Sequence, residues 1–342
     1  MRVITCASFY GTGSSAVTDF FSEFNDIYSL GDYEYRFLHE PDGIADLEYN
    51  IVENNHRHNT SDSIKRFMKY VESLKKMGYG GYDIFGKNYD ILTQRYIDEL
   101  VELKVHTWWD KDRKDKGRFF CFIDRVYSLL KRIFTGSLHT EKRFSILQKS
   151  EWGYYTTVSE EQFLAATRRY IDDLLACVNT DKAPFVMVDQ MAPPTNTKRF
   201  ARYFNDVKIV VVDRDPRDIY LLEKERWQWG IIPVKNVEDY VKWFKITRKY
   251  ASGADEDPSK VLRIKFEDMI YKYEEMKEKL TSFVEISPDK HVLPFTCFDP
   301  AKSIKNTNLK KTVSGYEEDI KYIEENLKDY LYDFPDNFEI KK

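Results

Sequence analysis

Cysteine and histidine are scarce in this sequence, with 4 and 6 residues respectively among 342. Cys6, Cys121, Cys177 and Cys297 lie far apart along the chain, which predicts free thiols and a reducing compartment instead of a disulfide framework. No Cys-x-x-Cys or His-x-x-x-His spacing occurs. The sequence therefore predicts that the protein holds no metal ion.

Long apolar runs and a strong net charge are also missing. No stretch reaches the roughly eighteen apolar residues of a membrane-spanning helix, and a strand pattern begins directly after Met1, so we expect a cytoplasmic protein. The net charge of -4 argues against a nucleic-acid partner, although it is compatible with a local basic crevice. With 42% hydrophobic residues, the chain can bury the core of one large domain or two.

Glycine is sparse, at 14 residues, yet two glycines stand close together in one predicted turn. A strand pattern at 3–7 precedes them, and a helix pattern with apolar residues at 17, 20, 21 and 24 follows. Positive φ at the glycines would bring several N–H groups together, and the helix dipole would add attraction for an anion. The predicted phosphate cradle consists of Gly11, Thr12, Gly13, Ser14, Ser15 and Ala16. The alternative is an ordinary strand–turn–helix in a doubly wound sheet.

The same turn lacks the lysine of a nucleoside-triphosphate P-loop, which ends in Gly-Lys-Ser/Thr. Ser14 follows Gly13 directly, and no carboxylate-bearing strand suitable for magnesium is obvious. The sequence thus disfavours triphosphate chemistry but keeps the predicted phosphate cradle.

A second buried strand is predicted at 207–213, where the residues are almost continuously apolar. The charged stretch that follows is Arg214-Asp215-Pro216-Arg217-Asp218. Ligands of open α/β sheets lie at the carboxyl ends of strands, so Arg214 and the glycine turn are predicted to face one crevice. A guanidinium suits a phosphate monoester there, because it donates two parallel hydrogen bonds and keeps its charge. The alternative is that Arg214 only pairs with a neighbouring aspartate.

Together these two stretches resemble the sulfotransferases that use 3'-phosphoadenosine 5'-phosphosulfate (PAPS), and most of all their bacterial, carbohydrate-type branch. The resemblance implies an α/β fold of the P-loop type, in which helices flank a central parallel sheet in three layers. It implies that the glycine turn binds the 5'-phosphosulfate and that Arg214, with Arg217, binds the 3'-phosphate. PAPS would be the sulfuryl donor, PAP the product, and no metal would be needed.

The stretch after the first helix, 27–38, supplies the catalytic base in this comparison. Carbohydrate sulfotransferases place a glutamate here, and Glu34 is the residue that aligns. A carboxylate can accept the proton of an attacking hydroxyl, and burial among aromatic residues would raise its pKa. His39 is the reserve base, because many members of the family use a histidine, and Glu40 and Asp42 follow it. The alternative is that Glu34 is an ordinary surface residue of a strand.

A late basic stretch, 298–311, resembles the loop that folds over the nucleotide in this family. It predicts Asn306 and Lys310 as further nucleotide contacts and Lys305 as a catalytic cation. The alternative is a solvated run of charges that leads into the last helix.

The sequence departs from the family pattern at two positions. The loop lysine of many members aligns with Gly11, so another cation, Lys305, Lys310 or Arg36, would have to neutralise the leaving group. The serine that follows the phosphate-binding arginine in the family falls at Leu222. These departures put individual contacts in doubt but not the class of protein.

The whole chain, 1–342, is predicted to be one sulfotransferase domain with a mostly helical insertion at 60–180 that shapes the acceptor site. Helices are predicted at 60–77, 88–103, 118–134 and 160–178, with a turn at 78–81 and an exposed loop at 107–116. The helix at 118–134 is basic and amphipathic, so it either packs within the protein or makes a peripheral membrane contact. Two more helices are predicted at 258–283 and 315–331, and no catalytic or binding role is assigned to either.

Residues for the acceptor are predicted at several strand ends and loops. A buried strand at 185–188 ends in Asp189 and Gln190, which we expect to point into the crevice with Arg36. Trp227 and Trp229 can stack on a sugar or adenine ring, or can simply pack. The acceptor is a glycan if the branch resemblance holds, and a sterol or other small lipid alcohol otherwise. A kinase-like phosphotransferase and a non-catalytic nucleotide-binding protein are the other hypotheses, and the oligomeric state stays open.

Overall fold

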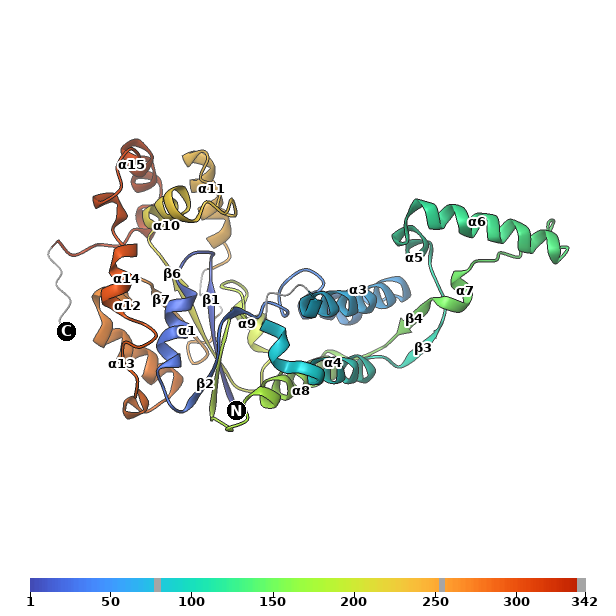
Figure 1. Cartoon of the computed structure of the whole chain (residues 1–342), viewed down its shortest axis with the longest axis horizontal. Coiled ribbons are helices and arrows are strands. Elements are labelled where there is room, and N and C mark those ends of the chain that lie inside the picture. The colour runs from blue at the N-terminus through green and yellow to red at the C-terminus, as the bar shows by residue number, and fades with distance from the viewer. Residues whose placement is uncertain (77–80, 252–255, 337–342) are drawn as a thin grey trace. The chain divides into compact units, whose positions relative to one another are not determined.

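The computed structural model describes residues 1–76, 81–251 and 256–336. The chain divides into two compact units (Figure 1). The first comprises Met1–His39, Tyr79–Asn88 and Ile171–Lys342, and the second comprises Glu40–Gly78 and Tyr89–Tyr170. The sequence places a helical insertion at 60–180, whereas the second unit begins at Glu40 and ends at Tyr170. Of the predicted turn at 78–81, only Gly81 lies within the described residues.

The first unit is built on a five-stranded parallel sheet with the order β2-β5-β1-β6-β7. Its strands are β1 (Arg2–Ser8), β2 (Ile27–Glu34), β5 (Phe185–Asp189), β6 (Val207–Asp213) and β7 (Val261–Lys265). Its helices are α1 (Ser14–Ser22), α9 (Thr197–Ala201), α10 (Pro216–Leu222), α11 (Val237–Arg248), α12 (Asp268–Tyr271), α13 (Tyr273–Val284), α14 (Pro300–Ser303) and α15 (Glu317–Asn326). The predicted α/β class with a central parallel sheet flanked by helices is confirmed.

Both faces of this sheet are buried, which explains the near-continuous apolar strands in the sequence. On one face, Ile4 of β1 and Val210 of β6 pack with Phe20 of α1 and Leu280 of α13. On the other face lie the alternate strand residues such as Val3, which is also buried, and α9 contacts β6. Because all five strands are parallel, their carboxyl ends share one edge of the sheet, where β1, β5 and β6 lie side by side. The glycine turn and Arg214 both follow strands at this edge.

The second unit is mostly helical. Its elements are α2 (Ile44–Glu48), α3 (Arg57–Lys76), β3 (Leu103–His106), α5 (Asp110–Asp115), α6 (Gly117–Phe134), α7 (Leu147–Ser150) and β4 (Trp152–Tyr155). The helices α4 (Gly86–Leu100) and α8 (Glu160–Val178) run through the boundaries of the two units. Phe67 of α3, Tyr96 of α4 and Tyr170 of α8 form its centre, where the Tyr96 and Tyr170 rings stack at 4.7 Å. β3 and β4 pair antiparallel.

Several secondary-structure predictions are confirmed, and two are wrong. The strands at 3–7, 185–188 and 207–213 and the helices at 118–134 and 160–178 are present, and α3 covers the described part of the helix predicted at 60–77. The segment 107–116 is not all loop, because α5 forms there and Asp112 accepts a hydrogen bond of 2.7 Å from the Trp109 N–H at its start. The segment 258–283 is not one helix, because it begins with β7, an edge strand of the sheet. The helix predicted at 88–103 ends at Leu100, and α15 covers the main part of 315–331.

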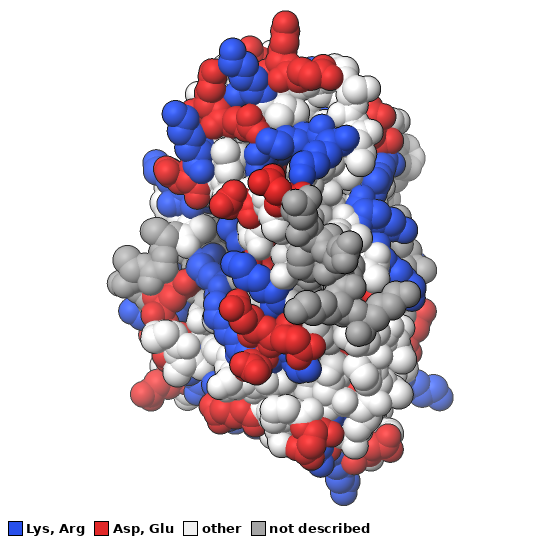
Figure 2. All heavy atoms as spheres, turned by 90° about the vertical axis from the view of Figure 1, so that its left-hand side faces the viewer, with Lys and Arg blue, Asp and Glu red and all other residues white. Residues whose placement is uncertain are grey.

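The surface of the first unit carries both signs of charge. Figure 2 shows Lys and Arg side chains mixed with Asp and Glu over the described part of the face formed by the C-terminal helices. This mixture gives no broad field of one sign on that face.

None of the helices within the described residues combines the length and the apolar character needed to cross a bilayer. All four cysteines are unpaired, and burial raises the pKa of the Cys6 thiol well above its usual value.

Candidate functional site

The turn between β1 and α1 has a conformation that its own side chains hold in place. Tyr10, Gly11 and Gly13 have positive φ values of 63°, 66° and 103°. The Thr12 hydroxyl accepts a hydrogen bond of 3.1 Å from the Phe9 N–H and donates one of 2.8 Å to the Val212 carbonyl of β6. Thr12 is completely buried, so this hydroxyl closes the turn and ties it to the neighbouring strand. The predicted strand–turn–helix is therefore present, with its amides at the start of α1.

The first turn of α1 has no capping side chain, in contrast to two other helices of the same unit. Asp215 caps α10 by accepting from the Arg217 N–H, and Asn236 caps α11 by accepting from the Asp239 N–H. At α1 the N-cap is Gly13, which has no side chain to offer. The first N–H groups of a helix have no partner within the helix, so this end can receive an anion.

Both turn glycines are required by close neighbours as well as by φ. A Cβ at position 11 would lie 2.4 Å from the Trp227 ring, and a Cβ at position 13 would lie 2.5 Å from the Phe266 ring. Either approach is closer than two carbon atoms can come without a shift. Phe266 and Trp227 thus form the walls beside the turn, and a lysine at position 11 would not fit this arrangement.

Arg214 connects the turn to the strand end of β6, as the sequence predicts. Its Nη1 donates to the Gly11 carbonyl at 3.3 Å, its Nη2 donates to the Asn306 carbonyl, and its guanidinium lies 4.4 Å from the centre of the Phe266 ring. The side chain is buried, with a residue exposure of 3%, and its Nε has no hydrogen-bond partner. One guanidinium thus brings together three segments that are far apart in the sequence. The hydrogen bonds of its side chain go to carbonyl oxygens, whereas the neighbouring Asp215 and Asp218 act on it through their charge.

Two buried carboxyl groups, those of Glu267 and Asp218, lie close enough to Arg214 to feel its charge. Glu267, just after β7, accepts from the Asp215 N–H at 2.8 Å, and Asp218 accepts from the Asn308 and Leu309 N–H groups at 2.8 Å each. Burial raises the pKa of Glu267 to about 8 and that of Asp218 to about 6, although Arg214 lowers both. Glu267 was missed by sequence reasoning because the segment was taken for a helix. The alternation of apolar Leu262, Ile264 and Phe266 with charged Arg263 and Lys265 was the signal for the strand.

A second group of polar residues lies at the ends of β2 and β5. Glu34 pairs with Asp189 in the strand register, Ser14 Oγ donates to Asp189 Oδ2 at 3.1 Å, and Glu34 forms an ion pair with Arg36. Asp189 is buried and its Oδ1 has no partner. Burial, and then the charge of Glu34, raises the pKa of Asp189 to about 8. Asp189 is therefore protonated at neutral pH, whereas Glu34 has a cation beside it.

His39 and Gln190 lie close to this group. His39 Nε2 donates to the Gln190 carbonyl at 2.9 Å, and the Gln190 side chain bonds to Ser8 at the end of β1. Gln190 has a φ of 57°, which turns the chain sharply after β5. The structure thus brings Glu34, Arg36 and Asp189 together, with His39 attached through the backbone of Gln190.

Arg217 and Lys310 are held elsewhere. Arg217 donates to both carboxylate oxygens of Asp215, to Glu324 at 2.7 Å and to the Tyr332 carbonyl at 2.9 Å. Lys310 also donates to Glu324, at 2.7 Å. Both cations therefore belong to an ion-pair cluster around Glu324 and α15. The structure does not bring either side chain into contact with the glycine turn.

The stretch 298–311 is less loop-like than predicted, because α14 and two short 3-10 helices at Ile304–Asn306 and Leu309–Lys311 form within it. Asn306 touches Arg214 through its carbonyl and accepts from Arg226 Nη1 at 2.6 Å through its side chain. Lys305 is exposed. Trp227 lies over Gly11 and stacks on Trp229 at 5.5 Å, and Trp229 is 67% exposed. Asn306, Trp227 and Trp229, unlike Arg217 and Lys310, therefore border the turn or contact a residue that does.

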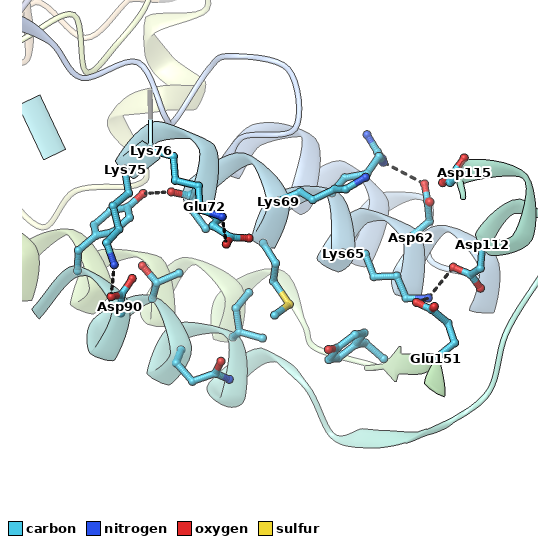
Figure 3. A pocket seen from close by; sticks show the side chains of 18 of the residues that line it. Asp62, Lys65, Lys69, Glu72, Lys75, Lys76, Asp90, Asp112, Asp115 and Glu151 are labelled. Atoms are coloured by element: carbon cyan, nitrogen blue, oxygen red, sulfur yellow. Dashed lines mark hydrogen bonds and ion pairs between the residues drawn. The ribbon is translucent and has the colours of Figure 1, made fainter. Parts of the chain in front are cut away.

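A separate groove of about 600 Å³ lies in the second unit, between α3 and α4 (Figure 3). Its charged lining residues are Asp62, Lys65, Arg66, Lys69, Glu72, Lys75, Lys76, Asp90, Asp112, Asp115, Lys116 and Glu151. Figure 3 shows many of them paired, as in the contact of 2.6 Å between Lys65 Nζ and Asp112. Because the positive and negative residues are equal in number, the groove has no net attraction for an anion.

Comparison with known proteins does not assign this chain to a family. No protein-family model matches the sequence, and no curated protein matches it. Among solved structures, one match is the crystal structure of retinol dehydratase in complex with androsterone and the inactive cofactor PAP. The identity is 14%, the match covers 98% of this chain and 84% of that one, and the TM-score is 0.32. A likeness at this level establishes neither a family nor a function.

Proposed function

We propose that this protein is a sulfotransferase that moves a sulfuryl group from PAPS to a hydroxyl group. The observation that carries the proposal is the contact of 3.3 Å between Arg214 Nη1 and the Gly11 carbonyl. It joins an uncapped helix N-terminus, suited to one anionic group, to a buried guanidinium, suited to another. A nucleotide with phosphate groups at both its 5' and 3' positions requires such a pair of sites.

The guanidinium of Arg214 has hydrogen-bond donors suited to a phosphate monoester, even though the side chain is buried in this structure. Two of its nitrogen atoms donate to neutral carbonyl oxygens, which are weaker acceptors than a charged phosphate oxygen. Its Nε is buried without an acceptor, which is costly and leaves one donor for a ligand. We propose that a 3'-phosphate replaces these carbonyl contacts and that the main chain at Asn306 shifts to admit it.

The carboxyl groups at the ends of β2 and β5 suit the acceptor chemistry. The acceptor oxygen would attack sulfur while the bond from sulfur to the bridging phosphate oxygen breaks, and PAP would leave with that electron pair. We assign the hydroxyl proton to Glu34, the more exposed carboxylate of the pair. Asp189, whose pKa of about 8 keeps it protonated, can instead donate a hydrogen bond to a substrate oxygen.

Charge on the leaving group needs a cation, since Gly11 stands where many sulfotransferases have lysine. Arg36 lies 5.6 Å from the centre of the Tyr10 ring, and so reaches the glycine turn. Lys305 is exposed one residue before the Arg214 contact at Asn306. We propose these two cations for the role. Arg217 and Lys310 are weaker candidates, because both bond to Glu324.

The acceptor is proposed to be a glycan hydroxyl, in keeping with the carbohydrate-type branch that the glutamate at position 34 resembles. The exposed Trp229 ring, stacked on Trp227, is suited to the apolar face of a sugar. A sterol or other lipid alcohol is the second acceptor class. A kinase-like reaction is disfavoured, because no lysine follows Gly13.

Thermal melting separates these functions in one measurement. The protein is melted alone, with PAP, and with ATP and magnesium, and we expect PAP to raise the midpoint whereas ATP with magnesium does not. A rise with ATP and magnesium alone would support the phosphotransferase and overturn the proposal. No response to either would support a protein with a non-functional site. Transfer of labelled sulfate from PAPS to a panel of glycans and sterols then tests the acceptor class.

A further inference from the structure

The helix α6 presents a broad apolar surface to solvent. Phe119 is 78% exposed, Phe122 65% and Phe134 83%. The exposed apolar side chains of the helix are Phe119, Phe122, Ile123, Val126, Leu129, Leu130, Ile133 and Phe134. At about 100° per residue, all of them fall within one arc of about 140°. Only Asp124 is buried among the residues of α6, so the predicted packing of this helix within the protein leaves its apolar side uncovered.

The opposite side of α6 is the side that packs. Asp124 accepts from the Ser145 hydroxyl and the Ile146 N–H at 2.8 Å each, and Cys121 Sγ donates to the Arg113 carbonyl at 3.3 Å. α5 contacts α6 on the same unit (Figure 1). The helix is therefore fixed to its unit through its polar side, and the apolar arc points away from that attachment.

The charges on the exposed part of α6 are all positive. Arg118 and Arg125 are exposed, lie seven residues apart and border one edge of the apolar arc. Arg132 continues this row, although it donates to the carbonyl groups of Leu138 and Thr140. The one acidic residue in the helix is the buried Asp124. The surface thus combines exposed phenylalanine and leucine with a row of arginine.

We propose that α6 lies in the interface of a membrane that contains anionic lipids, with the apolar arc among the acyl chains and Arg118 and Arg125 at the phosphate groups. This inference goes beyond the proposed function and does not depend on it. Charge complementarity favours this occupant over a second copy of the chain, because a second copy would bring the same positive row to the contact. The helix does not cross the bilayer, since it lacks the apolar character of a spanning segment.

Sedimentation of the full-length chain with vesicles tests the proposal. We expect binding to vesicles of phosphatidylcholine with about one third phosphatidylglycerol, and much weaker binding to phosphatidylcholine alone. Phe122→Ser with Leu129→Ser should lower the partition coefficient at least about tenfold. Arg118→Gln with Arg125→Gln should lower it by roughly twenty- to thirtyfold on the anionic vesicles, from about fivefold per arginine.

The matched control removes two exposed apolar side chains elsewhere, by Ile91→Ser with Ile246→Ser. These residues are 64% and 67% exposed and belong to α4 and α11. The control should bind like the wild type, and circular dichroism should show that every variant is folded. Absence of binding to anionic vesicles, or equal loss in the control, would overturn the proposal. So would a dimer in light scattering that Phe122→Ser with Leu129→Ser dissociates, because the arc would then be a contact between copies.

Discussion

The carboxyl group of Asp189 should make the protein less stable as the pH rises, and Asp189→Asn should remove that effect. Asp189 is 2% exposed, its Oδ1 has no partner, and its pKa is raised to about 8 by burial and by Glu34. The amide has nearly the same shape and still accepts the hydrogen bond from Ser14. The substitution therefore removes a titrating group without removing volume.

The sign follows from proton binding. An unfolded aspartate ionises near pH 4, whereas Asp189 in the folded protein keeps its proton to about pH 8. Between these values the folded state binds more protons, so the free energy of unfolding falls as the pH rises, and it levels off above pH 8. From pH 5 to pH 8 the loss is at most about 4 kcal/mol, at about 1.4 kcal/mol per pH unit. Asp189→Asn should flatten the profile by a large part of that amount.

Denaturant unfolding followed by circular dichroism at pH 5 to pH 9 measures this change. Glu267 also has a pKa raised to about 8, so the wild type should lose stability through both groups, and Glu267→Gln should show a separate, similar flattening. Asp329→Asn, at an exposed position, is the matched control and should leave the profile unchanged. If the profile of Asp189→Asn parallels that of the wild type, Asp189 is ionised in the folded protein and our account of this group is wrong.

Three further predictions concern the site itself. Arg214→Ala should weaken PAP binding about tenfold to a hundredfold in calorimetry, because a charged hydrogen-bonding group is lost, and Arg214→Lys should recover only part of it; unchanged affinity in the alanine variant would contradict the assignment. Glu34→Gln should keep PAP binding but lower sulfuryl transfer by two to four orders of magnitude, and full activity would place the base elsewhere. Gly11→Ala should lower the melting temperature, because its Cβ would lie 2.4 Å from Trp227 at a φ of 66°; an unchanged melting temperature would show that the ring moves aside.

The sequence predicted the sheet core and the meeting of its two main motifs. Strands β1 and β6 are buried on both faces, so their apolar runs are continuous, and parallel pairing then brings the segments after them to one edge. That is why the glycine turn and Arg214, roughly two hundred residues apart, could be expected to meet. The position of Asp189 followed from the same rule at the end of β5.

The sequence could not predict which charged residues pair with each other. Arg217 stands beside Arg214 in the motif, yet it faces Glu324 and Tyr332, whose places depend on how the C-terminal part of the chain folds back. β7 was missed because its five residues include an arginine and a lysine and another lysine precedes it, so the segment resembled an exposed helix. Glu267 was missed with it. α5 was missed because its start depends on Asp112 accepting from its own backbone, and not on apolar periodicity.

The buried hydroxyl of Thr12 has a consequence for how the turn receives a ligand. The Thr12 hydroxyl bonds to the Phe9 N–H within the turn and to the Val212 carbonyl of β6. The backbone of the turn therefore loses its conformational freedom when the chain folds. An anion that binds here would contact N–H groups that are already oriented, so the entropy cost of ordering this loop on binding would be small. We therefore expect that removal of this one buried hydroxyl would leave a turn that has to be ordered before it can bind an anion.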